Sequence, residues 1–136
     1  MNEGIVKEIV GVVVDVDFSG GELPAIYNAV EISRDGRRLV LEVQQHLGEN
    51  LVRCVAMDST DGLARGAKVV DTDKPIQVPV GEAVLGRLVN VVGEPIDGKG
   101  EFGDDVPRMP IHAAPPPHDE QVTIDEMLET GIKVMD

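Results

Sequence analysis

Apolar and polar side chains alternate along much of the first 80 residues of the chain. The alternation is clearest in residues 12–18, where every second side chain is apolar and two of the intervening ones are aspartates. Because successive side chains of a strand point to opposite faces, a period of two predicts a strand with one buried face. Gly11, directly before this run, is expected to form a bulge or a bend.

Five further segments have the pattern of short strands. They lie at residues 27–33, 39–44, 51–57, 68–71 and 76–80. Between the second and third strands, Asp35 and Gly36 predict a hairpin turn, because both residues tolerate a positive φ. Six short strands at close spacing favour a small closed barrel, which leaves no sheet edge exposed. We therefore predict a mainly β fold with a six-stranded N-terminal β-barrel in residues 1–80.

The pattern changes at Gly81. Between residues 84 and 92 the apolar side chains fall at helical spacing, which favours a helix, although the β-branched residues among them leave a strand possible. Residues 93–117 are rich in glycine and proline and predict a loop. Thr123 and Glu126 form a capping-box pair, which predicts a short helix closed by Gly131.

Composition indicates which residue types form the core and which classes of partner are unfavourable. Hydrophobic residues make up 42% of the chain but aromatic residues only 2%, so the core must be aliphatic. A net charge of −13 would repel nucleic-acid phosphates and anionic membrane surfaces, which are bound through clusters of Lys and Arg. The longest run without a polar side chain, residues 9–14, is too short for a membrane span. We expect no nucleic-acid partner and no direct membrane insertion.

Cys54 is the single cysteine of the chain, so no intrachain disulfide can form. It lies in the largely apolar run at residues 51–57, which favours a buried, inert thiol over a nucleophile.

One segment resembles a phosphate-binding loop. Residues 93–100 (GEPIDGKG) match three of the four fixed positions of G-x-x-x-x-G-K-[ST]. The last position is Gly100, which offers no hydroxyl to Mg²⁺, and the acidic Glu101, Asp104 and Asp105 follow where a helix N-terminus should face the phosphates. We therefore expect a turn-rich loop here.

Other arrangements of reactive side chains are incomplete. His46, His112 and His118 belong to no zinc-binding or H-E-x-x-H pattern, and the Asp71-x-Asp73 pair lacks the rest of a calcium loop. Adjacent acids such as Asp104 and Asp105 are typical of solvated loops. We predict no catalytic, cofactor-binding or metal-binding residue within the chain.

Several stretches together resemble the catalytic β subunit of F-type ATP synthases. They are residues 4–18 (GIVKEIVGVVVDVDF), 41–47 (LEVQQHL), 51–66 (LVRCVAMDSTDGLARG), 78–100 (VPVGEAVLGRLVNVVGEPIDGKG), 111–115 (IHAAP) and 129–136 (ETGIKVMD). Singly, these motifs are shared with the α subunit, flagellar and secretion ATPases and vacuolar-type enzymes. Their combination favours the β subunit over the α subunit.

The resemblance implies that residues 1–80 are the six-stranded barrel and that residues 81–136 are the incomplete start of an α/β nucleotide-binding (P-loop ATPase) domain. In the family, the barrels of three α and three β subunits form a ring that holds the hexamer around the central stalk. The phosphate loop, the catalytic acid and the adenine-stacking residues of the family all lie beyond Asp136. The chain by itself is therefore expected to be inactive and to bind no cofactor, whereas the full-length subunit would use Mg-ATP and ADP.

The same resemblance implies a function in ATP synthesis from ADP and phosphate, driven by a proton gradient and reversible as hydrolysis. Because no transit peptide is evident, we expect a peripheral position on the cytoplasmic face of a bacterial plasma membrane. A free-standing β-barrel interaction module is the alternative. The end of the chain at Asp136, at the start of a fresh apolar pattern, favours the fragment of the synthase.

Overall fold

A computed structural model describes residues 2–34, 36–121, 127 and 129–135. The β-strands in this part of the chain are β1 (Glu3–Val10), β2 (Val13–Asp17), β3 (Asn28–Arg34), β4 (Arg37–Gly48), β5 (Leu51–Ala56), β6 (Lys68–Pro75), β7 (Gln77–Pro79) and β8 (Arg108–Pro110). Two short 3₁₀ helices, η1 (Glu82–Val84) and η2 (His118–Glu120), accompany them.

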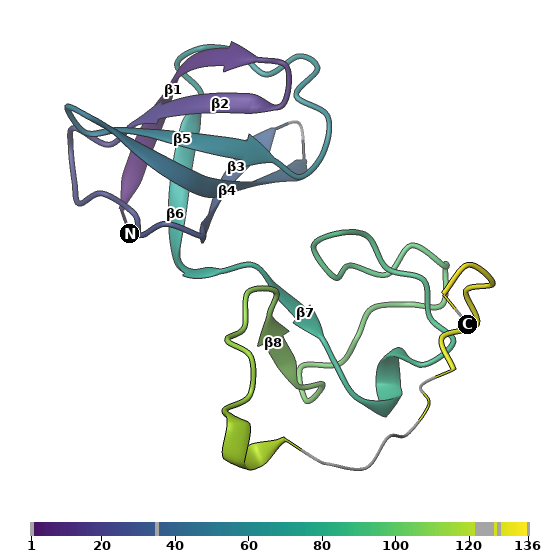
Figure 1. Ribbon diagram of the computed structural model, residues 1–136. Helices are drawn as coiled ribbons and strands as arrows, with labels where there is room; N and C mark the ends of the chain where they lie inside the picture. Colours follow the sequence, from purple (N-terminus) through teal and green to yellow (C-terminus); the bar gives the residue numbers. More distant parts are fainter. Residues whose placement is uncertain (1, 35, 122–126, 128, 136) are drawn as a thin grey trace.

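The first six strands form a closed antiparallel barrel in the order β1-β2-β5-β4-β3-β6. Strand β1 closes it, because it pairs with β2 on one side and with β6 on the other, where Gly4 lies opposite Val69. A separate two-stranded sheet of β7 and β8 follows, and Figure 1 shows it below the barrel with the remaining loops. The prediction of a mainly β fold with a six-stranded barrel is confirmed.

The barrel core is aliphatic, as the composition predicted. Its buried side chains come from alternating positions of all six strands and from Phe18 just after β2; they include Val6, Val14, Val16, Phe18, Val30, Ile32, Leu41, Val43, Val52, Cys54 and Val69. Valine suits this interior because its branched side chain loses little freedom on a pleated surface.

The first strand of the barrel was missed by the alternation. The sequence predicted one strand at residues 12–18, whereas the structure has a hairpin in which β1 precedes β2 and Gly11, at φ 60°, lies in the turn. A register shift between Val6 and Glu8 breaks the period of two along β1, which hides the strand. The bend expected at Gly11 is confirmed, but Val12 lies in the turn and is exposed rather than buried in the strand.

The strand predicted at residues 76–80 does not belong to the barrel, so its assignment there was wrong. The ladder between β3 and β6 ends at the pair Asn28–Pro75, and Pro75 has no N–H with which to extend it. The chain then leaves the barrel, and β7 pairs with β8 through Val78 and Met109. The predicted number of six barrel strands is still correct, because β1 takes the place of this segment.

The helix favoured at residues 84–92 is also wrong. Only η1 forms, and Leu85 after it adopts an extended ψ of 130°. Gly86 follows at φ 68°, which is outside the helical region, and an isolated bridge joins Val89 to Pro95. The helical spacing predicted an apolar stripe that packs against another surface. Leu85, Leu88 and Val91 instead remain exposed, so no packing stabilises a helix here.

Two expectations stay open. The capping-box helix at Thr123 and Glu126 lies outside the described residues, and the division into domains at residue 80 stays a prediction. Among the residues that the structure does describe, no helix is long and apolar enough to cross a membrane.

We predict that Leu41 is a core residue whose truncation unfolds the barrel. Because its side chain is fully buried, Leu41→Ala is expected to lower the free energy of unfolding by about 2–5 kcal/mol. Lys68→Ala is the control, since this side chain is largely exposed and its ion pair with Glu3 is worth only about 0–1 kcal/mol. Urea midpoints measure both, and equal midpoints would show that the register is wrong.

Candidate functional surface

The segment that resembles a phosphate loop is a turn-rich loop, as predicted. Residues 93–100 contain no regular element except the bridge at Pro95, and no α-helix begins in residues 101–121. Gly93 is required here for packing, because a Cβ on it would lie 2.5 Å from Cδ of Pro79 in β7. Lys99 donates from Nζ to the carbonyl oxygen of Gly86 at 3.2 Å.

The acid in this loop is engaged by an arginine. Arg87 donates from Nε and Nη2 to the carboxylate of Asp97 at 2.6 and 3.1 Å, and the backbone N–H of Lys99 donates to the same carboxylate. The hydrogen bonds from Arg87 hold the pKa of Asp97 well below its usual range. Arg87 also lies over the ring of Phe102, 4.6 Å from its centroid. These contacts hold the loop at residues 93–100 against the preceding segment that carries Arg87.

The three histidines lie apart from one another and have separate partners. His46 contacts the carbonyl oxygen of Pro24 at 2.7 Å, and His118 contacts the side chain of Gln121 at 3.1 Å. His112 contacts the carboxylate of Glu42 at 2.8 Å. Within the described ranges, no group of three or more His, Cys, Asp or Glu side chains is arranged to hold a metal ion.

Cys54 lies inside the barrel, as its apolar surroundings predicted. Its side chain is fully buried on β5, and this burial raises the pKa of the thiol to about 12. A thiol of such high pKa carries almost no thiolate near neutral pH, so it is a poor nucleophile.

The outer surface of the barrel is the candidate functional feature. Its β1–β2–β5 face carries cross-strand ion pairs between apolar side chains. Arg53 donates from Nε and Nη2 to Asp15 at 2.9 and 2.8 Å, and Lys7 lies 3.0 Å from Asp17. Hydrogen bonds from Ser19, and then from Lys7, lower the pKa of Asp17 to about 2.

Apolar side chains lie beside these ion pairs on the same face. Val10, at the end of β1, is 64% exposed and lines a shallow groove with Glu8, Val13, Asp15 and Arg53. We call the β1–β2–β5 surface the open face, because residues 76–112 do not cover it; in Figure 1 the β1–β2 hairpin lies at the end of the barrel away from β7 and β8. Protein interfaces combine an apolar centre with a polar rim, and this surface offers side chains of both kinds.

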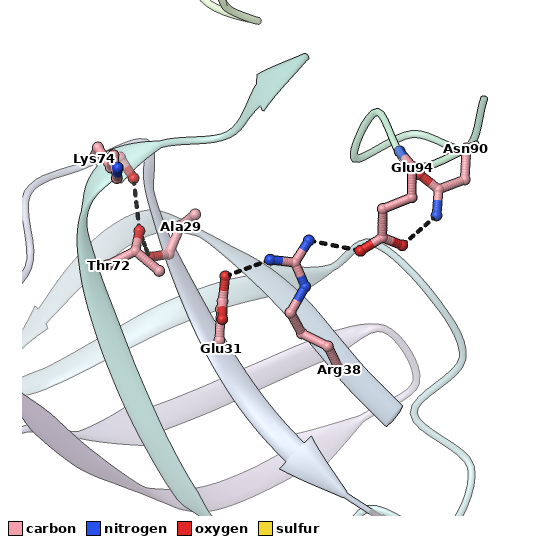
Figure 2. Close-up of polar contacts among 7 residues, drawn as sticks. All are labelled: Ala29, Glu31, Arg38, Thr72, Lys74, Asn90 and Glu94. Atoms are coloured by element: carbon pink, nitrogen blue, oxygen red, sulfur yellow. Dashed lines mark hydrogen bonds and ion pairs between the residues drawn. The ribbon is translucent and has the colours of Figure 1, made fainter. Parts of the chain in front are cut away.

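The opposite surface, on β3 and β4, is covered by the segment that follows the barrel. Ala29 and Val40 point outward there and form a second buried cluster with Ile76, against which Met57 and Val92 pack. Figure 2 shows Arg38 of β4 between Glu31 of β3 and Glu94 of the following loop. We call the β3–β4 surface the covered face.

Sequence reasoning predicted none of these contacts. Arg38 and Glu94 are 56 positions apart, and Glu42 and His112 are 70 apart. The one available signal is Val40, an apolar residue at an outward position of an alternating strand. It indicates that both faces of β4 are buried at this position, but it does not identify the segment that covers the outer face.

We predict that the Cys54 thiol is unreactive until the barrel unfolds. Ellman's reagent should label no thiol in the native chain and one in urea. Burial keeps the reagent away from the thiol and disfavours the thiolate that would react with it. Ser33→Cys places a second thiol at an exposed position of β3 and should react at once. Equal labelling rates for the native and unfolded parent chain would contradict the buried position.

We also predict that the chain does not bind Mg-ATP at micromolar concentrations, because Lys99 donates to Gly86 and the carboxylate of Asp97, paired with Arg87, lies in the loop. Isothermal titration calorimetry should give only heats of dilution. A micromolar affinity that Lys99→Ala abolishes would show that residues 93–100 bind phosphate after all.

Comparison with known protein families identifies the barrel. The family model described as "ATP synthase alpha/beta family, beta-barrel domain" matches residues 6–73, which is half of the chain. The matched range begins within β1 and ends within β6, so it contains parts of all six barrel strands. A closed six-stranded antiparallel barrel with this sequence match leads to one conclusion. The chain belongs to the ATP synthase alpha/beta family.

Proposed function

We propose that this chain is the N-terminal part of the catalytic β subunit of a proton-translocating F-type ATP synthase, and that its own task is assembly. The observation that carries the proposal is the family match over the closed barrel, residues 6–73. The stretches at residues 41–47, 51–66 and 78–100 in combination favour the β subunit over the α subunit.

The surfaces of the barrel support a task in assembly. A closed barrel has no free sheet edge with which to pair, so a neighbouring subunit must be bound through outward side chains. The open face offers Val10 beside the Asp15–Arg53 ion pair, and it also carries the Lys7–Asp17 pair. In an alternating ring, α subunits are the neighbours, and we assign the open face to one of those contacts.

The chemistry of the proposed enzyme lies elsewhere in the polypeptide. ATP synthesis or hydrolysis needs a phosphate loop that leads into a helix, and residues 93–100 lead into none. Mg-ATP and ADP are then ligands of the full-length subunit. We further propose that the subunit is peripheral, on the cytoplasmic face of a bacterial plasma membrane, and is held there through the complex.

Immunoprecipitation from membranes of the source cells tests the proposal directly. An antibody against the barrel should recover a polypeptide several times longer than 136 residues, with a G-x-x-x-x-G-K-[ST] loop soon after residue 136, together with α subunits and the central stalk. Mass spectrometry identifies them. Recovery of a 14.6 kDa chain without ATPase subunits would favour a free-standing interaction module instead.

We predict that Val10→Glu in the full-length subunit weakens α–β association. Burying a carboxylate in place of an apolar side chain removes the apolar contact and adds a desolvation cost, so we expect affinity to fall by at least about tenfold. Val10→Thr, which adds no charge at the same exposed position, is the control and should assemble normally. Native mass spectrometry counts the complexes. Unchanged assembly of Val10→Glu would remove the open face from the interface.

A further inference from the structure

The covered face joins the barrel to residues 76–112 around an apolar centre. Ala29 and Val40 of the barrel and Ile76 of the following segment are each no more than 6% exposed. Val92 packs against this cluster from the loop beyond η1. An apolar contact of this kind holds two parts together, but it is not directional, so it does not by itself fix the angle between them.

Arg38 makes directional hydrogen bonds on one side of the apolar centre. It donates from Nη1 to Glu31 at 3.0 Å and from Nη2 to Glu94 at 2.7 Å, so one guanidinium links the barrel to the following loop (Figure 2). Glu94 is held ready for it, because Asn90 donates from Nδ2 to its second carboxylate oxygen at 2.8 Å.

The loop that carries Glu94 is itself ordered by the same asparagine. Oδ1 of Asn90 accepts hydrogen bonds from the backbone N–H groups of Val92 and Glu94, at 3.1 and 2.9 Å. The acceptor for Arg38 is therefore part of a tight turn rather than a freely rotating side chain, which lowers the entropy lost when the ion pair forms.

Glu42 supplies a second directed contact. Its side chain is 5% exposed, and its two oxygens accept from Gln44 at 2.5 Å and contact His112 at 2.8 Å. The ring of His112 also lies 4.3 Å from the ring of Tyr27, centroid to centroid. The backbone of Ile111 is tied to Ile76 by a hydrogen bond of 3.0 Å, so this contact is continuous with the β7–β8 sheet.

From these contacts we infer that the covered face is an orientation clamp, in which Arg38–Glu94 and Glu42–His112 fix the angle between the barrel and the segment after it. One directed contact would allow the segment to pivot, whereas two prevent it. In the proposed synthase, on which this last consequence rests, the clamp makes the start of the nucleotide-binding domain turn together with the ring-bound barrel.

The clamp acts on orientation more than on stability. Arg38 and Glu94 are each 46% exposed, and an exposed ion pair contributes little to the free energy of unfolding. Such a weak pair is sufficient here because Pro75 and Ile76 are covalently joined, so the partner is always at a high effective concentration. Arg38 is thus a positioning residue, and its replacement should widen the range of angles without unfolding the barrel.

A charge-swap experiment on the chain tests this inference. Spin labels at Gln45→Cys of β4 and Leu85→Cys after η1, both exposed positions, in a Cys54→Ala background report the distance between the two parts by double electron–electron resonance. The parent should give a single narrow distance distribution. Arg38→Glu and Glu94→Arg should each lose it and give a broad one, while the far-ultraviolet circular dichroism of the barrel stays unchanged.

The double variant, Arg38→Glu with Glu94→Arg, should restore the narrow distribution in part, because the pair across the two parts is re-formed with reversed charges while Glu31 then faces a carboxylate. Arg37→Glu is the matched control, since it changes the same charge at the neighbouring exposed position and should leave the distribution narrow. His112→Ala should broaden it as Arg38→Glu does.

A broad distribution in the parent, narrow distributions in the single variants, or no recovery in the double variant would each overturn the clamp. None of these outcomes depends on α subunits. A failure of the clamp is therefore distinct from a failure of the proposed function.

Discussion

Closure of the barrel by β1 is the constraint on which the rest of the structure depends. Strand β1 pairs with β2 through five residues and with β6 through three, and without it the sheet would expose an edge on each of those strands. Gly4 allows the close approach, because a Cβ there would lie 2.9 Å from the carbonyl oxygen of Asp17. Closure encloses a core of small branched side chains, so the barrel needs no large aromatic residue beyond Phe18 in the part of the chain that is described.

Once the barrel is closed, its function has to be carried by outward side chains. The covered face on β3 and β4 binds the chain that follows, and the open face on β1, β2 and β5, with its ion pairs and the exposed Val10, is the surface that we propose for a neighbouring subunit. This division would suit the ring subunit that we propose, because one surface of such a subunit would hold the next domain while another meets a neighbour. The chemistry of reactive groups agrees with it. Cys54 is enclosed, and Asp97 is occupied by Arg87.

The sequence predicted the barrel well where local pattern decides structure, and poorly where packing decides it. The pattern of apolar residues located strands β2 to β5 and part of β6, the composition indicated an aliphatic core, and the glycines and prolines located the loop at residues 93–100. It missed β1, where a bulge interrupts the alternation, and it placed residues 76–80 in the barrel although Pro75 ends the ladder. The sequence pattern favoured a helix at residues 84–92 because the spacing of apolar residues does not reveal the positive φ of Gly86, which interrupts a helix. The contacts of Arg38 and Glu42 lay beyond prediction, since their partners are distant in the chain and leave no local signal.

Native-state amide hydrogen exchange tests the central claim, a closed barrel with the following segment docked on one face. Backbone N–H groups paired in β1 and β6 should exchange with the same free energy of opening as those in β3 and β4, because a closed barrel opens as one unit. The N–H of Ile111, which donates to Ile76, should be protected but open at a lower free energy, since the docked segment can detach while the barrel stays closed. Exchange of β1 and β6 well before β3 and β4 would contradict the account, because it would show a sheet with free edges rather than a barrel.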